Sequence, residues 1–180
     1  MTELVNIAGE GMPLYLWERM ATESGDMTAW EVGEQRAQRE AGGFSYRNTV
    51  LRIEDDVPVA ALIGYPIAKE LDPDRYDGMP EMFIPLQQLE DLVTGSWYIN
   101  VLATLADFRG RGFGSDLLEV AEKLAHESGG DAISLIVNDA NTGGRRLYAR
   151  HDYEEVARRP IIKENWSNEG TEWVLLRKGL

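Results

Sequence analysis

Cysteine is missing from this chain of 180 residues, and histidine occurs only twice. The lack of cysteine excludes disulfide frameworks, zinc–cysteine sites, iron–sulfur clusters and cysteine nucleophiles, and it is compatible with a reducing compartment. The two histidines, His126 and His151, are far apart in the sequence, so no metal site is expected. Neither histidine stands in a serine–carboxylate pattern, which argues against a hydrolase triad.

Basic residues are also scarce. The 18 lysines and arginines face 31 aspartates and glutamates, which gives a net charge of −13. Proteins that bind nucleic acid usually carry a basic field, so nucleic acid is not an expected partner. The acidic balance would attract a cationic partner, although it also serves solubility.

Long apolar runs are absent too. No stretch approaches the ~20 apolar residues of a membrane-spanning helix, and Met1–Glu10 lacks the basic and apolar regions of a signal peptide. We therefore expect a cytoplasmic protein without membrane contact. No repeat or linker divides the chain, so a single domain over residues 1–180 is expected. Lys69–Gly95, acidic and turn-rich at its start and helical at about Pro80–Val93, indicates an insertion between strands.

What is present is an alternation of strands and helices. Thr49–Glu54 and Val57–Tyr65, joined by a turn at Asp55–Asp56, predict an antiparallel hairpin. Ala132–Val137 is a nearly continuous apolar run, typical of a central strand. The other expected strands are Val5–Ala8, Trp97–Thr104, Tyr153–Ile162 and Glu172–Lys178, and the expected helices are one from Pro13 to Gly25, Thr28–Glu40, Gly112–Glu127 and Gly144–His151.

The densest local signal is the run Arg109-Gly110-Arg111-Gly112-Phe113-Gly114-Ser115, between a predicted strand and a predicted helix. Glycines let the main chain approach a ligand closely, and the N–H groups at a helix N-terminus favour an anion. The run therefore predicts a pyrophosphate site. Its glycine spacing does not fit the dinucleotide fingerprint, and the Gly-Lys-Ser/Thr ending of the nucleotide P-loop is missing.

The pattern that does fit is Arg/Gln-x-x-Gly-x-Gly/Ala, and with it the chain resembles the GNAT acyltransferase superfamily. A second block, Asn141 to Tyr148, starts 32 positions after Arg109 and is similar to that family's Asn-x-x-Ala-x-x-Leu-Tyr helix. A third, Leu102-Ala103-Thr104, matches the family's bulged strand before the loop. Together the three blocks lie within Trp97–Val156, about a third of the chain.

The resemblance implies an α/β (α+β) fold with a mixed, mostly antiparallel sheet of six to seven strands flanked by helices. The sheet would splay between the strands at Trp97 and Ala132, with acetyl-CoA as co-substrate in the gap. Tyr148 would be the general acid that protonates the leaving thiolate, and Asn141 would contact the pantetheine arm or orient the loop near it. The main chain of Leu102, Ala103 and Thr104 would hold that arm, and the N–H groups of Arg109, Gly110, Arg111, Gly112, Phe113, Gly114 and Ser115 would hold the pyrophosphate.

The sequence departs from the family pattern at three places, two single residues and one run of three. Ala106 stands where proline is common, and Gly144 stands where alanine is common. His151-Asp152-Tyr153 replaces the usual Leu-Gly-Phe at the end of the second block. The family glycine takes a left-handed conformation, which aspartate tolerates better than most residues.

The implied activity is transfer of an acetyl group to a primary amine of a small molecule or peptide, by direct attack in a ternary complex. An amine of pKa ~10 must first lose a proton to a base or to water, and the candidate bases are Glu54, Glu81, Glu154 and Glu172. The acceptor would be framed by Trp17, Met20, Trp30 and Asn165-Trp166-Ser167, although aromatic residues at helical spacing are more often core. The acidic stretch Glu70–Asp77 is either a selector of cationic acceptors, a solvated loop or a dimer contact.

Two other readings stay open. One is a non-catalytic module on the same fold that binds or senses acyl-CoA, in which Tyr148 only packs against the sheet. The other is an unrelated enzyme whose glycine loop binds a nucleotide. The length of the acyl group and the formation of a homodimer are also open.

Overall fold

The computed structural model describes all 180 residues, and they form two compact units. The first unit comprises Met1–Gly64, Asn100–Leu117 and Asn165–Asn168. The second unit comprises Tyr65–Ile99, Leu118–Glu164 and Glu169–Leu180. The single-domain organisation with an insertion at about residues 69–95 remains a prediction.

Six strands make one mixed sheet in the order β1-β2-β3-β4-β6-β5. The pairs β1–β2, β4–β6 and β5–β6 are antiparallel, and the pair β3–β4 is parallel. The expected fold class is therefore confirmed, with six strands rather than seven. The seventh expected strand, Val5–Ala8, is wrong because this segment is helical.

The first unit begins with three helices and a hairpin. Leu4, Val5 and Ala8 pack into its core with the i, i+1, i+4 spacing of a helix, whereas the short run Val5-Asn6-Ile7-Ala8 alone mimics the alternation of a strand. The elements are α1 (Thr2–Ala8), α2 (Met12–Ser24), α3 (Ala29–Ala37), the 3-10 turn η1 (Tyr46–Asn48), β1 (Thr49–Glu54) and β2 (Val57–Pro66).

The hairpin prediction is confirmed. Asp55 and Asp56 between β1 and β2 have φ of 48° and 62°. Positive φ at both central residues is the mark of a type I′ turn, whose twist matches that of the paired strands. The same unit contains the end of β3 (Trp97–Thr104), the 3-10 turn η4 (Ala106–Phe108) and the first turn of α5 (Phe113–Glu127).

Trp17 on α2 organises the core of the first unit. Its side chain is 3 % exposed and packs with Val5, Val32, Ile63 and Val101. The ring lies directly on the backbone of α3, since a Cβ atom at Gly33 would come within 2.8 Å of the Trp17 ring. The absence of a side chain at Gly33 is therefore what lets α2 and α3 approach.

The second unit holds the central strands. Trp97–Ile99 of β3 pair in parallel with Ile133–Leu135 of β4 (Ala132–Asn138). β6 (Glu172–Gly179) lies between β4 and β5 (Glu154–Pro160), antiparallel to both. The expected helical stretch at Pro80–Val93 is confirmed as the 3-10 turn η2 (Glu81–Phe83), α4 (Ile84–Glu90) and the 3-10 turn η3 (Asp91–Val93).

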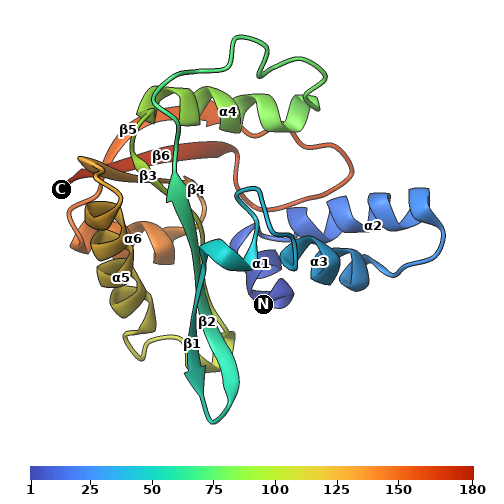
Figure 1. The fold of residues 1–180 in the computed structure, drawn as a ribbon, viewed down its shortest axis with the longest axis horizontal. Helices are drawn as coiled ribbons and strands as arrows, with labels where there is room; N and C mark the ends of the chain where they lie inside the picture. Colours follow the sequence, from blue (N-terminus) through green and yellow to red (C-terminus); the bar gives the residue numbers. More distant parts are fainter. The chain divides into compact units, whose positions relative to one another are not determined.

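Helices cover both sides of these strands. α4 packs against β5 and β6, and Arg159 Nε of β5 donates to Gln88 Oε1 of α4 at 3.1 Å. Figure 1 shows α4 on one side of the strands of this unit and α5 on the other. Lys178 of β6 forms an ion pair with Glu122 of α5 at 2.7 Å. No helix of the structure has the length and apolar character that crossing a membrane requires.

We predict that Gly33→Ala destabilises the protein although alanine favours helix. The propensity gain is about 1 kcal/mol, whereas the new methyl group overlaps a rigid, buried indole ring, and such overpacking costs about 1–3 kcal/mol. Urea unfolding followed by circular dichroism measures the net loss.

The matched control is Gly143→Ala on α6 (Thr142–Arg150). The closest atom to a Cβ atom there, Asn141 Oδ1, is 4.0 Å away. This variant should be neutral or slightly more stable than the wild type. A Gly33→Ala protein as stable as Gly143→Ala would show that the Trp17 contact imposes no constraint.

Candidate functional site

The predicted phosphate loop lies in the first unit, where it joins β3 to α5. Gly110 and Gly112 have φ of 76° and 91°, a left-handed backbone that a side chain disfavours. A Cβ atom at either position would meet no atom within 4 Å, so conformation rather than space requires glycine. The N–H of Asp116 donates to the Gly112 carbonyl at 3.1 Å, and N–H groups in the first turn of a helix have no helical acceptor.

Three guanidinium groups gather around this loop. Arg111 lies over the rings of Phe108 and Phe113, at 5.2 Å and 5.1 Å from their centroids. Arg52 of β1 lies 4.7 Å from the Phe113 centroid. Arg109 Nε donates to the Thr104 carbonyl at 3.2 Å. Glu54 forms ion pairs with two of these groups, Arg52 and Arg111, so an anion bound at this helix N-terminus would share them with a carboxylate.

The end of β3 leads into this loop from the same unit. Ala103 is buried, and Leu102 and Thr104 are half-buried. The main chain of Thr104 was predicted to bond the pantetheine arm. In the structure its carbonyl already accepts a hydrogen bond from the Arg109 side chain. The structure thus brings Leu102 to Thr104 and Arg109 to Ser115 together in one unit, and their roles toward a ligand remain proposals.

The second predicted block lies in the other unit, where it forms α6. Asn141 is its N-cap, and Asn141 Oδ1 accepts from the Gly144 N–H at 2.9 Å. A Cβ atom at Gly144 would come 3.0 Å from that oxygen. Glycine instead of alanine therefore leaves room for the cap, which gives Asn141 a structural role in holding α6.

Tyr148 is held at the other end of this helix. Asp152 has φ of 63°, and the turn it makes lets the Tyr153 N–H donate to the Tyr148 carbonyl at 3.1 Å. The Tyr148 and Tyr153 rings lie 5.8 Å apart. Tyr148 is 8 % exposed, and this burial raises the pKa of its hydroxyl. The phenol is therefore protonated at neutral pH, as a proton donor must be.

A carboxylate that the sequence interpretation missed lies in the same unit as Tyr148. Glu90, the last residue of α4, is half-buried, and this burial raises its pKa to about 7. The Tyr98 hydroxyl of β3 donates toward it. A signal was available, because Leu86, Leu89, Glu90 and Val93 have the i, i+3, i+4, i+7 spacing of an apolar helix face, with glutamate at one position.

The four carboxylates that the sequence offered as the general base lie in surroundings that differ from those of Glu90. Glu54 forms ion pairs with Arg52 at 2.6 Å and with Arg111 at 3.6 Å, beside the glycine loop. Glu172 forms an ion pair with Arg158 at 2.9 Å. Glu81 and Glu154 are exposed to solvent. Paired or fully hydrated carboxylates are poor bases, so none of the four has the environment of Glu90.

The aromatic residues expected to frame the acceptor divide between core and surface. Trp17 is a core residue, and Trp166 is buried as well. Met20 and Trp30 are 36 % and 41 % exposed, and the Trp30 ring meets the Trp17 ring edge-on with centroids 6.0 Å apart. Trp17 is therefore part of the core, as aromatic residues at helical spacing more often are, and does not frame a pocket.

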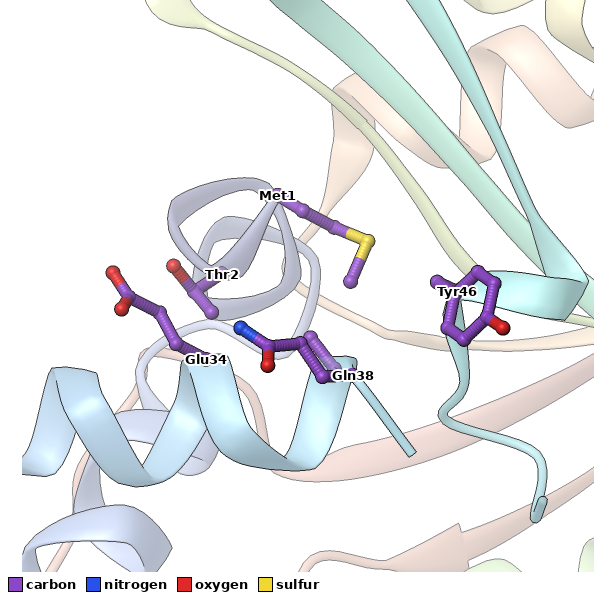
Figure 2. A pocket seen from close by; sticks show the side chains of 6 residues that line it. Met1, Thr2, Glu34, Gln38 and Tyr46 are labelled. Atoms are coloured by element: carbon purple, nitrogen blue, oxygen red, sulfur yellow. The ribbon is translucent and has the colours of Figure 1, made fainter. Parts of the chain in front are cut away.

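A pocket of about 330 Å³ opens in the first unit, between the start of α1, the end of α3 and η1 (Figure 2). Figure 2 shows Thr2 beside Glu34, Met1 above Gln38, and Tyr46 apart from these four. Its lining contains one carboxylate, Glu34, and no residue predicted from the sequence to bind or react.

Comparison with known proteins identifies the family. The sequence model of the acetyltransferase (GNAT) family matches residues 14–153 of this chain. No curated protein sequence matches the chain significantly.

Solved structures share the fold at low sequence identity. A crystal structure of an acetyltransferase is 19 % identical, with a TM-score of 0.63 over 99 % of this chain and 92 % of that one. A GNAT acetyltransferase from Elizabethkingia anophelis with acetyl-CoA bound is 17 % identical, with a TM-score of 0.54 over 73 % and 75 %. The Drosophila melanogaster polyamine N-acetyltransferase, which forms N-acetylagmatine, is 14 % identical, with a TM-score of 0.61 over 75 % and 76 %. With the family model spanning most of its length, this chain belongs to the GNAT family of acetyltransferases.

Proposed function

We propose that this protein is an N-acetyltransferase that moves the acetyl group of acetyl-CoA to a primary amine of a small molecule or peptide. The observation that carries the proposal is the loop Arg109–Ser115, which combines a helix N-terminus, two left-handed glycines and three nearby guanidinium groups. Membership in the GNAT family supports the same donor.

The loop is proposed to hold the pyrophosphate of acetyl-CoA. Main-chain N–H groups of Arg109–Ser115 would donate to the phosphate oxygens, apart from the Arg109 N–H, which already donates to the Ala106 carbonyl at 3.2 Å. The α5 dipole would favour the phosphate charge. Leu102, Ala103 and Thr104 would extend the pantetheine arm along β3, and Asn141, besides its capping role, would contact the arm through its side-chain amide.

The reaction we propose is direct. The uncharged amine nitrogen attacks the thioester carbon, the carbon–nitrogen bond forms, and the carbon–sulfur bond breaks. Tyr148 gives its hydroxyl proton to the departing thiolate and recovers a proton from the nitrogen of the new amide. The raised pKa of Tyr148 keeps that proton in place until sulfur develops negative charge.

The acceptor class is inferred from charge. A net charge of −13 raises the local concentration of cations and disfavours anionic substrates. Among proteins of this fold, the Drosophila enzyme acts on polyamines. A cationic amine is therefore the acceptor that we propose to test first.

We predict that acetyl-CoA and coenzyme A raise the thermal midpoint of the protein, whereas ATP and NAD do not. A ligand that binds only the native state stabilises it by mass action. Parallel thermal-shift titrations measure this. A shift with ATP or NAD alone would favour the nucleotide alternative and reject the donor assignment. A shift with the coenzyme A species but no thiol release with any amine would favour a binding module.

We predict that Gly112→Asp weakens coenzyme A binding at least ~100-fold, about 2.8 kcal/mol, as measured by calorimetry. The substitution places a negative charge and a side chain in the proposed phosphate site. Gly112→Asn is the matched control, because asparagine has the same shape and tolerates positive φ without the charge.

The difference in coenzyme A affinity between the two Gly112 variants measures the effect of the negative charge alone. We expect Gly112→Asn to bind more tightly than Gly112→Asp, with similar thermal midpoints for both. Equal and undiminished affinity in the two variants would show that the pyrophosphate lies elsewhere.

We predict that Tyr148→Phe lowers kcat by ~100-fold while the KM for acetyl-CoA changes little, since only transition-state stabilisation is lost. Tyr153→Phe is the control. The Tyr153 ring is adjacent and its buried hydroxyl has no hydrogen-bond partner, so its removal should leave kcat unchanged. A rise in KM alone for Tyr148→Phe would make Tyr148 a binding residue.

A further inference from the structure

The three guanidinium groups beside the glycine loop are engaged to different degrees. Arg109 Nε donates to the Thr104 carbonyl at 3.2 Å. Arg52 Nε and Nη2 both donate to Glu54 Oε1, at 2.9 Å and 2.6 Å. Arg111 donates no hydrogen bond to the protein, and its Nη2 lies 3.6 Å from Glu54 Oε2, an ion-pair distance only. Of the three groups, Arg111 therefore keeps its N–H donors available to a ligand.

Aromatic rings rather than hydrogen bonds hold Arg111 in place. Its guanidinium lies 5.2 Å from the centroid of the Phe108 ring and 5.1 Å from that of Phe113. A guanidinium over a ring is held by its charge, and its N–H donors stay unused. The Arg111 side chain is 49 % exposed, so a solute can reach these donors.

Glu54 is fixed on β1 beside this group. Residues two apart on a strand lie on the same face, which places Glu54 next to Arg52. Arg52 bonds Glu54 Oε1 twice and lies 4.7 Å from the centroid of the Phe113 ring. Oε1 is thus taken by Arg52, whereas Oε2 has only the longer contact with Arg111.

We propose that Glu54 competes with a phosphate group of the donor for Arg111. Arg52 keeps the carboxylate paired and in place whichever anion Arg111 contacts. This inference rests on the proposed acetyltransferase function, because it takes the ligand of the glycine loop to be the pyrophosphate of acetyl-CoA. It assigns to Glu54 the control of how tightly the donor is held.

The competition favours the phosphate. An ion pair between partly exposed side chains contributes little to stability, because water screens the two charges. A phosphate group instead accepts two charge-assisted hydrogen bonds from one guanidinium in a matching geometry. Arg111 gives up no hydrogen bond to make them, and Glu54 keeps its partner Arg52. Glu54 therefore lowers the affinity for the donor without preventing its binding.

The same competition acts on the product. Coenzyme A carries the same pyrophosphate as acetyl-CoA, so Glu54 weakens the binding of both. Product release limits kcat in many enzymes. A carboxylate that pairs with Arg111 again as the phosphate leaves favours the departure of coenzyme A.

The test is the affinity for coenzyme A of Glu54→Gln, measured by calorimetry. Glutamine keeps the size of the side chain and removes its charge. We expect the Kd to fall about fivefold, the upper range for one exposed ion pair. Glu54→Ala, which leaves no amide to bond an arginine, should change the Kd in the same direction. The thermal midpoint of each variant shows whether it is folded.

The matched control is Asp56→Asn in the turn of the same hairpin. It removes one negative charge from an exposed side chain, and asparagine tolerates the φ of 62° at this position. Because Asp56 forms no ion pair with the loop, its removal should change the Kd by less than ~2-fold. An equal gain in Asp56→Asn and Glu54→Gln would attribute the effect to net charge and overturn the proposal.

A double-mutant cycle with Arg111→Gln tests the route of the effect. Arg111→Gln alone should bind coenzyme A at least ~10-fold more weakly, because charge-assisted hydrogen bonds are lost. In that background, Glu54→Gln should bring no further gain, since the cation for which the carboxylate competes is missing. A change in fold stability alone would not produce this dependence. A gain that persists without Arg111, or an affinity that Arg111→Gln leaves unchanged, would overturn the proposal.

The outcomes distinguish the inference from the function on which it rests. If the wild type binds coenzyme A and neither Glu54→Gln nor Glu54→Ala binds it more tightly, the inference fails and the acetyltransferase proposal stands. If the wild type binds neither coenzyme A nor acetyl-CoA, the proposed donor is wrong and the inference fails with it.

Discussion

The chain must turn sharply between β3 and the start of α5, and the candidate donor site depends on this constraint. Gly110 and Gly112 meet it by adopting a left-handed backbone, with open space where side chains would stand. The guanidinium groups of Arg52, Arg109 and Arg111 gather beside the start of this helix. A loop of ordinary residues would carry the same charges but could not make this turn without strain.

Charge pairing distinguishes the carboxylates of this acidic protein. Glu54 is paired with arginines beside the loop, Glu172 with Arg158, and Asp91 with Arg75 and two neutral donors. These pairs serve structure, because a carboxylate that already has its cation gains little by binding another. Glu90 is half-buried without such a partner, and burial raises its pKa to about 7.

Structural features that depend on a few consecutive residues could be predicted from the sequence. The glycine loop, the turn at Asp55–Asp56 and the tolerance of Asp152 for a left-handed backbone each depend on the preferences of one or two residues. The apolar run at Ala132–Val137 identified the central strand for a similar reason, since burial on both faces leaves no alternation. Val5–Ala8 failed because four residues are too few to separate a period of two from a period of 3.6.

The sequence by itself determined the family resemblance, the order of elements after the first and the residues of the glycine loop, because these depend on neighbours along the chain. Only the tertiary structure decided which carboxylates are neutralised and which is not. Trp17 likewise became a core residue because α3 carries glycine where the ring packs, a contact between residues 16 positions apart. Glu90 differs from Glu54 only in what surrounds it, and burial, pairing and pKa are properties of surroundings that folding creates.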